Sequence, residues 1–432
     1  MNDLHQMAFD ARTAAWTLAA STRPERDQAL LAMAEELESR KEAIFAANQA
    51  DVAQAEEDHL AAPLLGRLKF GPEKLAAVTA GLRALANLPD PIGHTDLSRE
   101  LTPGLKMYRV SCPIGVIGVI FESRPDALVQ IASLALKSGN AVLLKGGREA
   151  SRTNRELCRA LRCAAEKAGL PADFAQLMET REDVAAMLKE DALIDLIIPR
   201  GSNAFVRYIM DNSRIPVLGH ADGVCHVYVD KAADLPMAVN IAADSKTQNV
   251  AVCNAMETLL VHRDVAMDFL PMLLPALQAK NVHILGEETV QGIIPCAPAT
   301  ENDWHAEYLD YTLSIKVVDS LEEAIAHVNR YGSHHTDAIV TSDEAAAQAF
   351  LTRVDSAGVY HNVSTRFADG FVYGFGAEVG IATGKIHARG PMGLEGLTTY
   401  KYKLLGSGQL MAEMKSGQRE YTHTLLNEEC PL

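Results

Sequence analysis

The chain lacks the features that mark membrane, secreted and nucleic-acid-binding proteins. None of its uncharged apolar runs approaches the roughly 20 residues that a membrane-spanning helix needs. Its first residues show no basic segment followed by an apolar one, so we expect no secretion signal. Basic residues number 40 against 56 acidic ones, the net charge is −16, and no Lys/Arg block occurs. We therefore expect no nucleic-acid partner and no anionic membrane surface.

Paired cysteines and phosphate loops are also missing. The seven cysteines are odd in number, scattered in spacing and contain no C-x-x-C. This pattern argues against a disulfide framework and a zinc site, and it predicts a reducing cytoplasm and no metal. No G-x-x-x-x-G-K-[ST] loop exists, and the glycines of residues 374–380 are one residue too far apart for a dinucleotide fingerprint.

What is present is a long alternation of apolar strands and amphipathic helices. With 432 residues, 48% of them hydrophobic, the chain is large enough for two or three domains. After a helical start, buried strands are predicted at residues 115–121 and 141–145, with a helix at 125–137 that Gly139 ends. A second alternating block begins near residue 231. This alternation predicts α/β domains with parallel sheets covered by helices on both faces.

Cys253 lies between a polar run that begins at Lys246 and an apolar run, residues 259–261, that is typical of a strand. A thiol on rigid backbone, with free N–H groups around it, suits a nucleophile that attacks a carbonyl and stabilises the oxyanion. An isolated cysteine is more often a small buried hydrophobe. The local sequence leaves both interpretations open.

Other polar groups follow predicted strands, where ligands bind in open α/β sheets. Lys145 and Arg148 flank two glycines that can hold a phosphate or ribose, or simply form a turn. Gly201 and Ser202 precede a helix and can offer N–H groups to a pyrophosphate, or act as its cap. Arg124 and Arg366 can each bind an anionic group or form a surface ion pair.

The tandem His334-His335 has no further ligands at metal spacing, and we interpret it as a loop feature.

In this order the stretches resemble the aldehyde dehydrogenase superfamily up to about Leu405. The segments that carry the resemblance are residues 113–125 (PIGVIGVIFESRP), 198–201 (IPRG), 223–230 (GVCHVYVD), 246–248 (KTQ), 253–254 (CN), 257–261 (ETLLV) and 385–395 (KIHARGPMGLE). The resemblance implies an aldehyde dehydrogenase-like α/β fold with two parallel-sheet domains and a small oligomerisation element. The expected division is a nucleotide-binding domain at 1–104 and 114–230, a catalytic domain at 231–396, an oligomerisation element at 105–113 and 397–410, and a polar tail at 411–432.

Within the superfamily the resemblance is to members that reduce L-glutamyl 5-phosphate to L-glutamate 5-semialdehyde and release phosphate, the second step of proline biosynthesis. It implies a thioester on Cys253, NADPH as the cofactor, a homo-oligomer and glutamate 5-kinase as a possible partner. The site residues it implies are Cys253 and Asn254 for catalysis, Arg124, Ser364, Thr365 and Arg366 for the substrate, and Lys145, Arg148, Gly201, Ser202 and Glu307 for the cofactor.

Two departures from ordinary aldehyde dehydrogenases refine this expectation. Where those enzymes place a glutamate that activates water, this chain has His220 or a neighbour, and an enzyme that starts from an acyl phosphate needs no such water. Arg148 stands where an acid often selects against a 2′-phosphate, which favours NADPH. The alternatives are a CoA-acylating or hydrolytic member of the superfamily, or a non-catalytic paralogue that partners the kinase.

Overall fold

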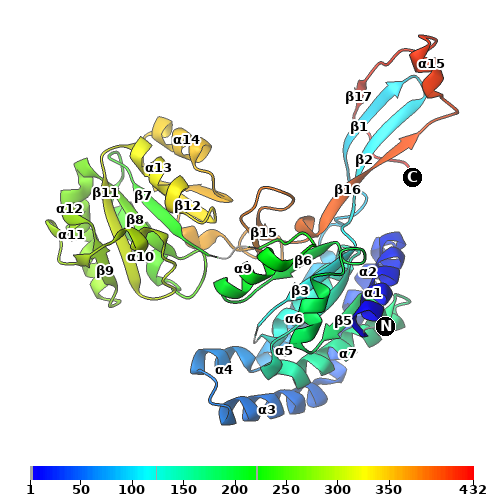
Figure 1. The fold of residues 1–432 in the computed structure, drawn as a ribbon, viewed down its shortest axis with the longest axis horizontal. Helices are drawn as coiled ribbons and strands as arrows, with labels where there is room; N and C mark the ends of the chain where they lie inside the picture. The colour runs from blue at the N-terminus through cyan, green and yellow to red at the C-terminus, as the bar shows by residue number, and fades with distance from the viewer. Residues whose placement is uncertain (1–2, 123, 220–221) are drawn as a thin grey trace.

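The structure, a computed structural model, describes residues 3–122, 124–219 and 222–432. Figure 1 shows three parts: an N-terminal α/β unit, a central α/β unit, and a narrow antiparallel arm that projects from the N-terminal unit. No helix within these ranges is both long and apolar enough to cross a membrane. The predicted α/β class, with two parallel sheets, is confirmed.

The N-terminal unit is built on a parallel four-stranded sheet of order β5-β4-β3-β6. The strands are β3 (Val116–Ile120), β4 (Ala141–Lys145), β5 (Ala175–Met178) and β6 (Leu196–Pro199). The two inner strands, β3 and β4, are buried on both faces, as their unbroken apolar sequences predict. Helices α2, α5, α6 and α7 pack against one face of the sheet, and α1, α8 and α9 against the other.

The helices of this unit follow the predicted pattern closely. They are α1 (Asp3–Ala20), α2 (Arg23–Ser39), α3 (Lys41–Glu57), α4 (Ala62–Leu68), α5 (Pro72–Asn87), α6 (Pro125–Lys137), α7 (Ser151–Lys167), α8 (Arg181–Met187) and α9 (Asn203–Asn212). Helix α6 has Pro125 in its first turn and ends two residues before Gly139, whose φ of +73° requires the left-handed conformation that glycine adopts readily.

The central unit contains a parallel seven-stranded sheet of order β10-β9-β11-β8-β7-β12-β13. Its strands are β7 (Cys225–Val229), β8 (Met256–His262), β9 (His283–Gly286), β10 (Ala297–Pro298), β11 (Thr312–Val318), β12 (Thr336–Val340) and β13 (Gly358–His361). Its helices are α10 (Leu235–Thr247), α11 (Arg263–Gln278), α12 (Glu288–Gln291), α13 (Leu321–Tyr331) and α14 (Glu344–Arg353). Helices α10 and α11 cover one face, and α13 and α14 cover the other.

The arm is an antiparallel sheet of order β16-β2-β1-β17 (Figure 1). Its strands are β1 (Thr95–Thr102), β2 (Leu105–Pro113), β16 (Thr398–Leu405) and β17 (Thr424–Leu426). A hairpin of β14 (Gly380–Ala382) and β15 (Gly390–Met392) precedes β16 in the chain. The expected polar tail, residues 411–432, contains α15 (Met411–Lys415) and adds β17 to the arm beside β1. The side chain of Ser98 donates to the carbonyl of Leu426 at 2.9 Å, a contact that tail composition does not predict.

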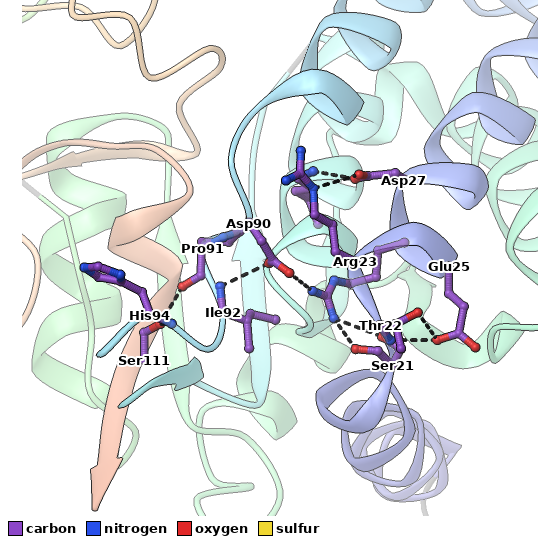
Figure 2. Close-up of polar contacts among 12 residues, drawn as sticks. Ser21, Thr22, Arg23, Glu25, Asp27, Asp90, Pro91, Ile92, His94 and Ser111 are labelled. Carbon is purple, nitrogen blue, oxygen red and sulfur yellow. Dashed lines mark hydrogen bonds and ion pairs between the residues drawn. The ribbon is translucent and has the colours of Figure 1, made fainter. Parts of the chain in front are cut away.

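A buried arginine joins the segment that leads into the arm to the N-terminal helices, and Figure 2 labels its partners Ser21 and Asp90. Arg26 is 1% exposed and donates to the carbonyl of Ser21 at 2.5 Å and to a carboxylate oxygen of Asp90 at 2.7 Å. The other oxygen of Asp90 accepts from the backbone N–H of Ile92 at 3.1 Å, just before β1. Because this buried charge is paired and hydrogen-bonded, it fixes the backbone where the chain leaves the helices and enters the arm.

The two sheets present opposite ends to the same region. Arg124 and Arg200 follow the carboxyl ends of β3 and β6, and Lys145 is the last residue of β4, whereas Cys253 and Glu307 precede the amino ends of β8 and β11. The amide nitrogen of Asn203, at the start of α9, donates to Glu307 Oε2 at 2.7 Å and so joins the two units there.

Candidate active site

The loop of Cys253 lies against Gly223, and only glycine fits there. A Cβ atom on Gly223 would lie 2.3 Å from the Cys253 carbonyl oxygen and 2.5 Å from its Cα. On the next strand, the buried thiol of Cys225 contacts the same carbonyl at 3.3 Å. The backbone that carries the Cys253 thiol is therefore held from two sides, while the residue itself is partly exposed.

His335 is a candidate site residue that the sequence analysis missed. It is 1% exposed and lies just before β12, with Nε2 at 3.2 Å from Cys253 Sγ and Nδ1 at 2.9 Å from the hydroxyl of Thr336. Both histidines of the pair lie in the loop between α13 and β12, as we interpreted them. That interpretation did not reveal the contact of His335 with Cys253, whereas His334 Nδ1 contacts the carbonyl of Asp355 at 2.6 Å.

The surroundings of Cys253 favour the neutral thiol. Burial, with smaller effects from Glu307 and Glu378, raises the pKa of Cys253 to about 12, against the opposing positive charge of Arg200. At neutral pH the sulfur therefore holds its proton. An acceptor must take the proton when the sulfur attacks, and the imidazole of His335 is within hydrogen-bond distance.

Asn254 is buried, and its amide is directed at the backbone of a neighbouring turn. Its Nδ2 donates to the carbonyl of Ala368 at 2.9 Å and more weakly to that of Arg366 at 3.4 Å. In return, the hydroxyl of Thr365 donates to the Asn254 carbonyl at 2.7 Å. These bonds tie the turn at residues 364–368 directly to the residue after the nucleophile.

Of the three expected substrate residues in this turn, one side chain reaches solvent. Ser364 and Thr365 are 5% and 0% exposed, and the Ser364 hydroxyl lies 3.1 Å from that of Ser245. Arg366 is partly exposed, and its Nε donates to Gln248 Oε1 at 2.9 Å. Burial lowers the pKa of Arg366, opposed by the nearby Cys253.

Two arginines of the N-terminal unit follow neighbouring strands, and one of them, Arg200, is close enough to Cys253 for their charges to interact. Arg124 precedes α6, has a half-exposed side chain and pairs with Asp126 at 3.0 Å. Arg200 is placed beside it because β3 and β6 are neighbours, and its backbone N–H donates to the Ile120 carbonyl at 2.7 Å. Burial lowers the pKa of Arg200, with Glu378 opposing this effect and Arg124 adding to it. The sequence drew attention to the glycine after Arg200 and overlooked the guanidinium.

The turn after β4 has the form of a cradle for a nucleotide. Lys145 is buried and donates to the carbonyl of Gly146 at 2.6 Å, while Arg148 is exposed. A Cβ atom on Gly146 would lie 2.3 Å from Asn154 Nδ2. Asn154 Oδ1 is buried without a hydrogen-bond partner among the described residues. Close backbone approach, a local cation and an unused acceptor fit the adenosine end of a dinucleotide.

The start of α9 and Glu307 are the remaining candidates for the cofactor site. Ser202 precedes α9 and is exposed, and its side chain makes no cap hydrogen bond. The first N–H groups of this helix therefore remain available to a pyrophosphate. Asn203 connects this end directly to Glu307. A Cβ atom on Gly201 would lie 2.8 Å from Glu122 Oε1. His220 lies outside the described residues.

Cysteine pairing and metal ligation are absent from the part of the chain that the structure describes. All seven cysteines, each of which is described, are free thiols. In residues 3–122, 124–219 and 222–432, no group of three or more His, Cys, Asp or Glu side chains is arranged to hold a metal ion.

Comparison with known proteins identifies the family to which the chain belongs. The aldehyde dehydrogenase family matches residues 1–294. Gamma-glutamyl phosphate reductases from Acetivibrio thermocellus and Pelotomaculum thermopropionicum are 56% and 55% identical to this chain, each over 99% of it and over 100% and 98% of their own lengths. The crystal structure of gamma-glutamyl phosphate reductase from Thermotoga maritima has a TM-score of 0.93 at 39% identity, with 95% of this chain and 100% of that one covered.

An acetylating aldehyde dehydrogenase from Geobacillus thermoglucosidasius, 19% identical, has a TM-score of 0.65 over 94% of this chain and 97% of its own, and shares the fold. The chain therefore belongs to the aldehyde dehydrogenase family, in the group whose relatives carry the name gamma-glutamyl phosphate reductase.

Proposed function

We propose that the chain reduces L-glutamyl 5-phosphate to L-glutamate 5-semialdehyde with NADPH, releasing phosphate by way of a thioester on Cys253. The observation that carries the proposal is the Cys253 Sγ, 3.2 Å from His335 Nε2, just before the amino ends of β8 and β12. The names of the relatives support the same reaction, which belongs to proline synthesis from glutamate. Family membership implies a nicotinamide cofactor.

In the proposed reaction the sulfur of Cys253 attacks the acyl carbon while His335 accepts the thiol proton. The bond between the acyl carbon and the phosphate oxygen breaks, and Arg200 and Arg124 receive the negative charge of the departing phosphate. A reduced nicotinamide, when bound, supplies the hydride for the reduction. Cleavage of the carbon–sulfur bond then frees the aldehyde, and Cys253 takes back a proton.

The remaining candidate residues bind the substrate or the cofactor, or support the residues that do. Arg366, on the turn tied to Asn254, is the candidate for the free carboxylate of the glutamyl group, and the buried Ser364 and Thr365 support that turn. Lys145, Arg148, Gly201, Ser202 and Glu307 are the candidates for holding the cofactor.

The experiment that tests the function follows the reverse reaction by the absorbance of NADPH. With glutamate 5-semialdehyde and NADP, we expect reduction of NADP to require inorganic phosphate. Oxidation that proceeds equally without phosphate would indicate a hydrolytic enzyme, and oxidation that requires coenzyme A would indicate an acylating one. Absence of all three activities in a protein that binds NADPH would support the non-catalytic alternative.

Cofactor choice gives a separate prediction for Arg148. Replacing Arg148 with Ser removes the exposed cation that we assign to the 2′-phosphate, a charge-assisted interaction worth about 1.5–3 kcal/mol. We expect the Kd for NADPH, measured by its fluorescence, to rise about 10- to 100-fold while the Kd for NADH stays nearly constant. An equal rise for both cofactors would contradict the assignment.

We also propose that the arm joins copies of the chain and that the enzyme works in the cytoplasm, where its free thiols stay reduced. The outer strand β16 presents Tyr400, Tyr402 and Leu404 to solvent, each more than half exposed. An outer strand that exposes such a row of aromatic and apolar side chains on a projecting sheet is suited to contact with a second copy. Glutamate 5-kinase remains a possible partner because it makes the acyl phosphate.

A further inference from the structure

A fully buried ion pair joins the two ends of the loop that carries Cys253. Lys246, in the last turn of α10, places its Nζ 2.5 Å from Oε2 of Glu257, the second residue of β8. Both side chains are 0% exposed. The segment between them carries Cys253, so the pair fixes the two ends of that loop against each other. Neither residue belongs to the set that we assign to substrate or cofactor.

The same pair holds the turn that carries Glu307. The second carboxylate oxygen of Glu257 accepts from the backbone N–H of Leu309 at 3.2 Å. Leu309 has a φ of +52°, a left-handed conformation that costs energy for a leucine and persists only where surrounding contacts impose it. The ammonium of Lys246 lies 5.8 Å from the ring centre of Tyr308, whose hydroxyl is 2.6 Å from that of Ser314.

Stability alone does not account for such a pair. Burial raises the pKa of Glu257 to about 7 and lowers that of Lys246, which shows how strongly the interior opposes both charges. A buried ion pair is often no more stable than a well-packed apolar pair of similar volume. What the apolar pair lacks is an acceptor that reaches the Leu309 N–H. The contact with this turn is therefore the property that only the polar pair supplies.

We infer that Lys246 and Glu257 are positioning residues that hold the Cys253 loop and the Glu307 turn against each other. They thereby fix the position of the acyl group on the sulfur relative to the nicotinamide end of the cofactor. The inference rests on the proposed function, because it needs Cys253 to carry the acyl group and Glu307 to contact the cofactor. The two residues act through the backbone and touch neither ligand.

Direct binding of NADPH, followed by its fluorescence without substrate, tests the inference on the full-length protein. The double variant Lys246→Met with Glu257→Met removes both charges and the acceptor for Leu309. We expect its Kd for NADPH to rise about tenfold, the effect of losing one buried hydrogen bond and the conformation that it imposes. The variant Lys246→Gln with Glu257→Gln keeps an acceptor at residue 257, and we expect it to recover most of the affinity.

A control removes an ion pair in the N-terminal unit that belongs to neither loop. Lys137 is 0% exposed and pairs with Asp27 between α6 and α2. We expect Lys137→Met with Asp27→Met to leave the Kd for NADPH as it is in the wild type. If the methionine pair at 246 and 257 does not fold, Glu257→Asp replaces it, because it keeps the charge but is one methylene too short to reach both Lys246 and Leu309.

A double-mutant cycle with Glu307→Ala distinguishes a positioning role of the pair from a general loss of protein stability. If the pair acts through this turn, its loss and the loss of Glu307 must combine to less than the product of their separate effects on Kd. Independent effects, or unchanged NADPH affinity in both the methionine and aspartate variants, would overturn the inference. Failure of the wild type itself to bind NADPH would instead refute the proposed function.

Discussion

Replacing Cys253 with Ala abolishes turnover and leaves the protein able to bind NADPH. We expect kcat to fall by about 10⁴-fold or more, because alanine lacks the sulfur that forms the proposed thioester. The loop should keep its shape, since Gly223 and Cys225 contact its backbone and not the sulfur. Steady-state assays of NADP reduction give kcat, and fluorescence titration gives the Kd for NADPH.

The matched control is Cys163→Ala, a partly exposed cysteine on α7, which should retain full activity. Mass spectrometry adds a direct measurement, because wild-type protein mixed with the acyl phosphate and no NADPH should gain the mass of one glutamyl group on Cys253. Substantial turnover by Cys253→Ala, or acylation at another residue, would rule out the thioester.

The state of the thiol gives a pH dependence with a definite sign. Because burial raises the pKa of Cys253 to about 12, the thiolate is scarce at neutral pH and increases as pH rises. In the absence of substrate, alkylation of Cys253 by iodoacetamide should accelerate about tenfold per pH unit over roughly pH 7 to 10. A rate that is already constant near pH 7 would reveal a preformed thiolate and contradict this description.

Local signals in the sequence were sufficient for most of the fold. Unbroken apolar runs predict strands that are buried on both faces, and β3 and β4 are such strands. Helix α6 was predictable to the residue, because Pro125 and Gly139 act on the backbone directly. The end of α10 carries no such signal, because its last residues, Lys246 and Thr247, are polar. The helix continues there because Lys246 finds its partner in the interior, 11 residues along the chain.

Contacts between distant segments were the part that the sequence did not reveal. The pairing of β17 with β1 joins Ser98 to Leu426, and three residues in a polar tail carry no periodic signal. Local polarity pointed to Lys145 and Arg148 near a glycine turn, but it did not show which of the arginines lies near Cys253. Arg200 becomes prominent only when β3 and β6 are known to be neighbours.

His335 illustrates the limit most clearly, and it supports the second large prediction. It lies 82 residues from Cys253, and the two come together because β12, β7 and β8 are consecutive strands of a parallel sheet, so that segments before these strands share one edge. We expect His335→Asn to lower kcat about 10²- to 10⁴-fold, the usual contribution of a positioned general base, with little change in the Kd for NADPH.

The neighbouring residue provides an unusually close control. His334→Asn makes the same substitution one position away, at a φ of +61° that asparagine tolerates, and should leave kcat nearly unchanged. The size of the His335→Asn defect should shrink as pH rises, because hydroxide increasingly removes the proton that His335 accepts in the wild type. A defect that is the same at every pH, or equal defects at both positions, would mean that His335 serves packing and that another group deprotonates Cys253.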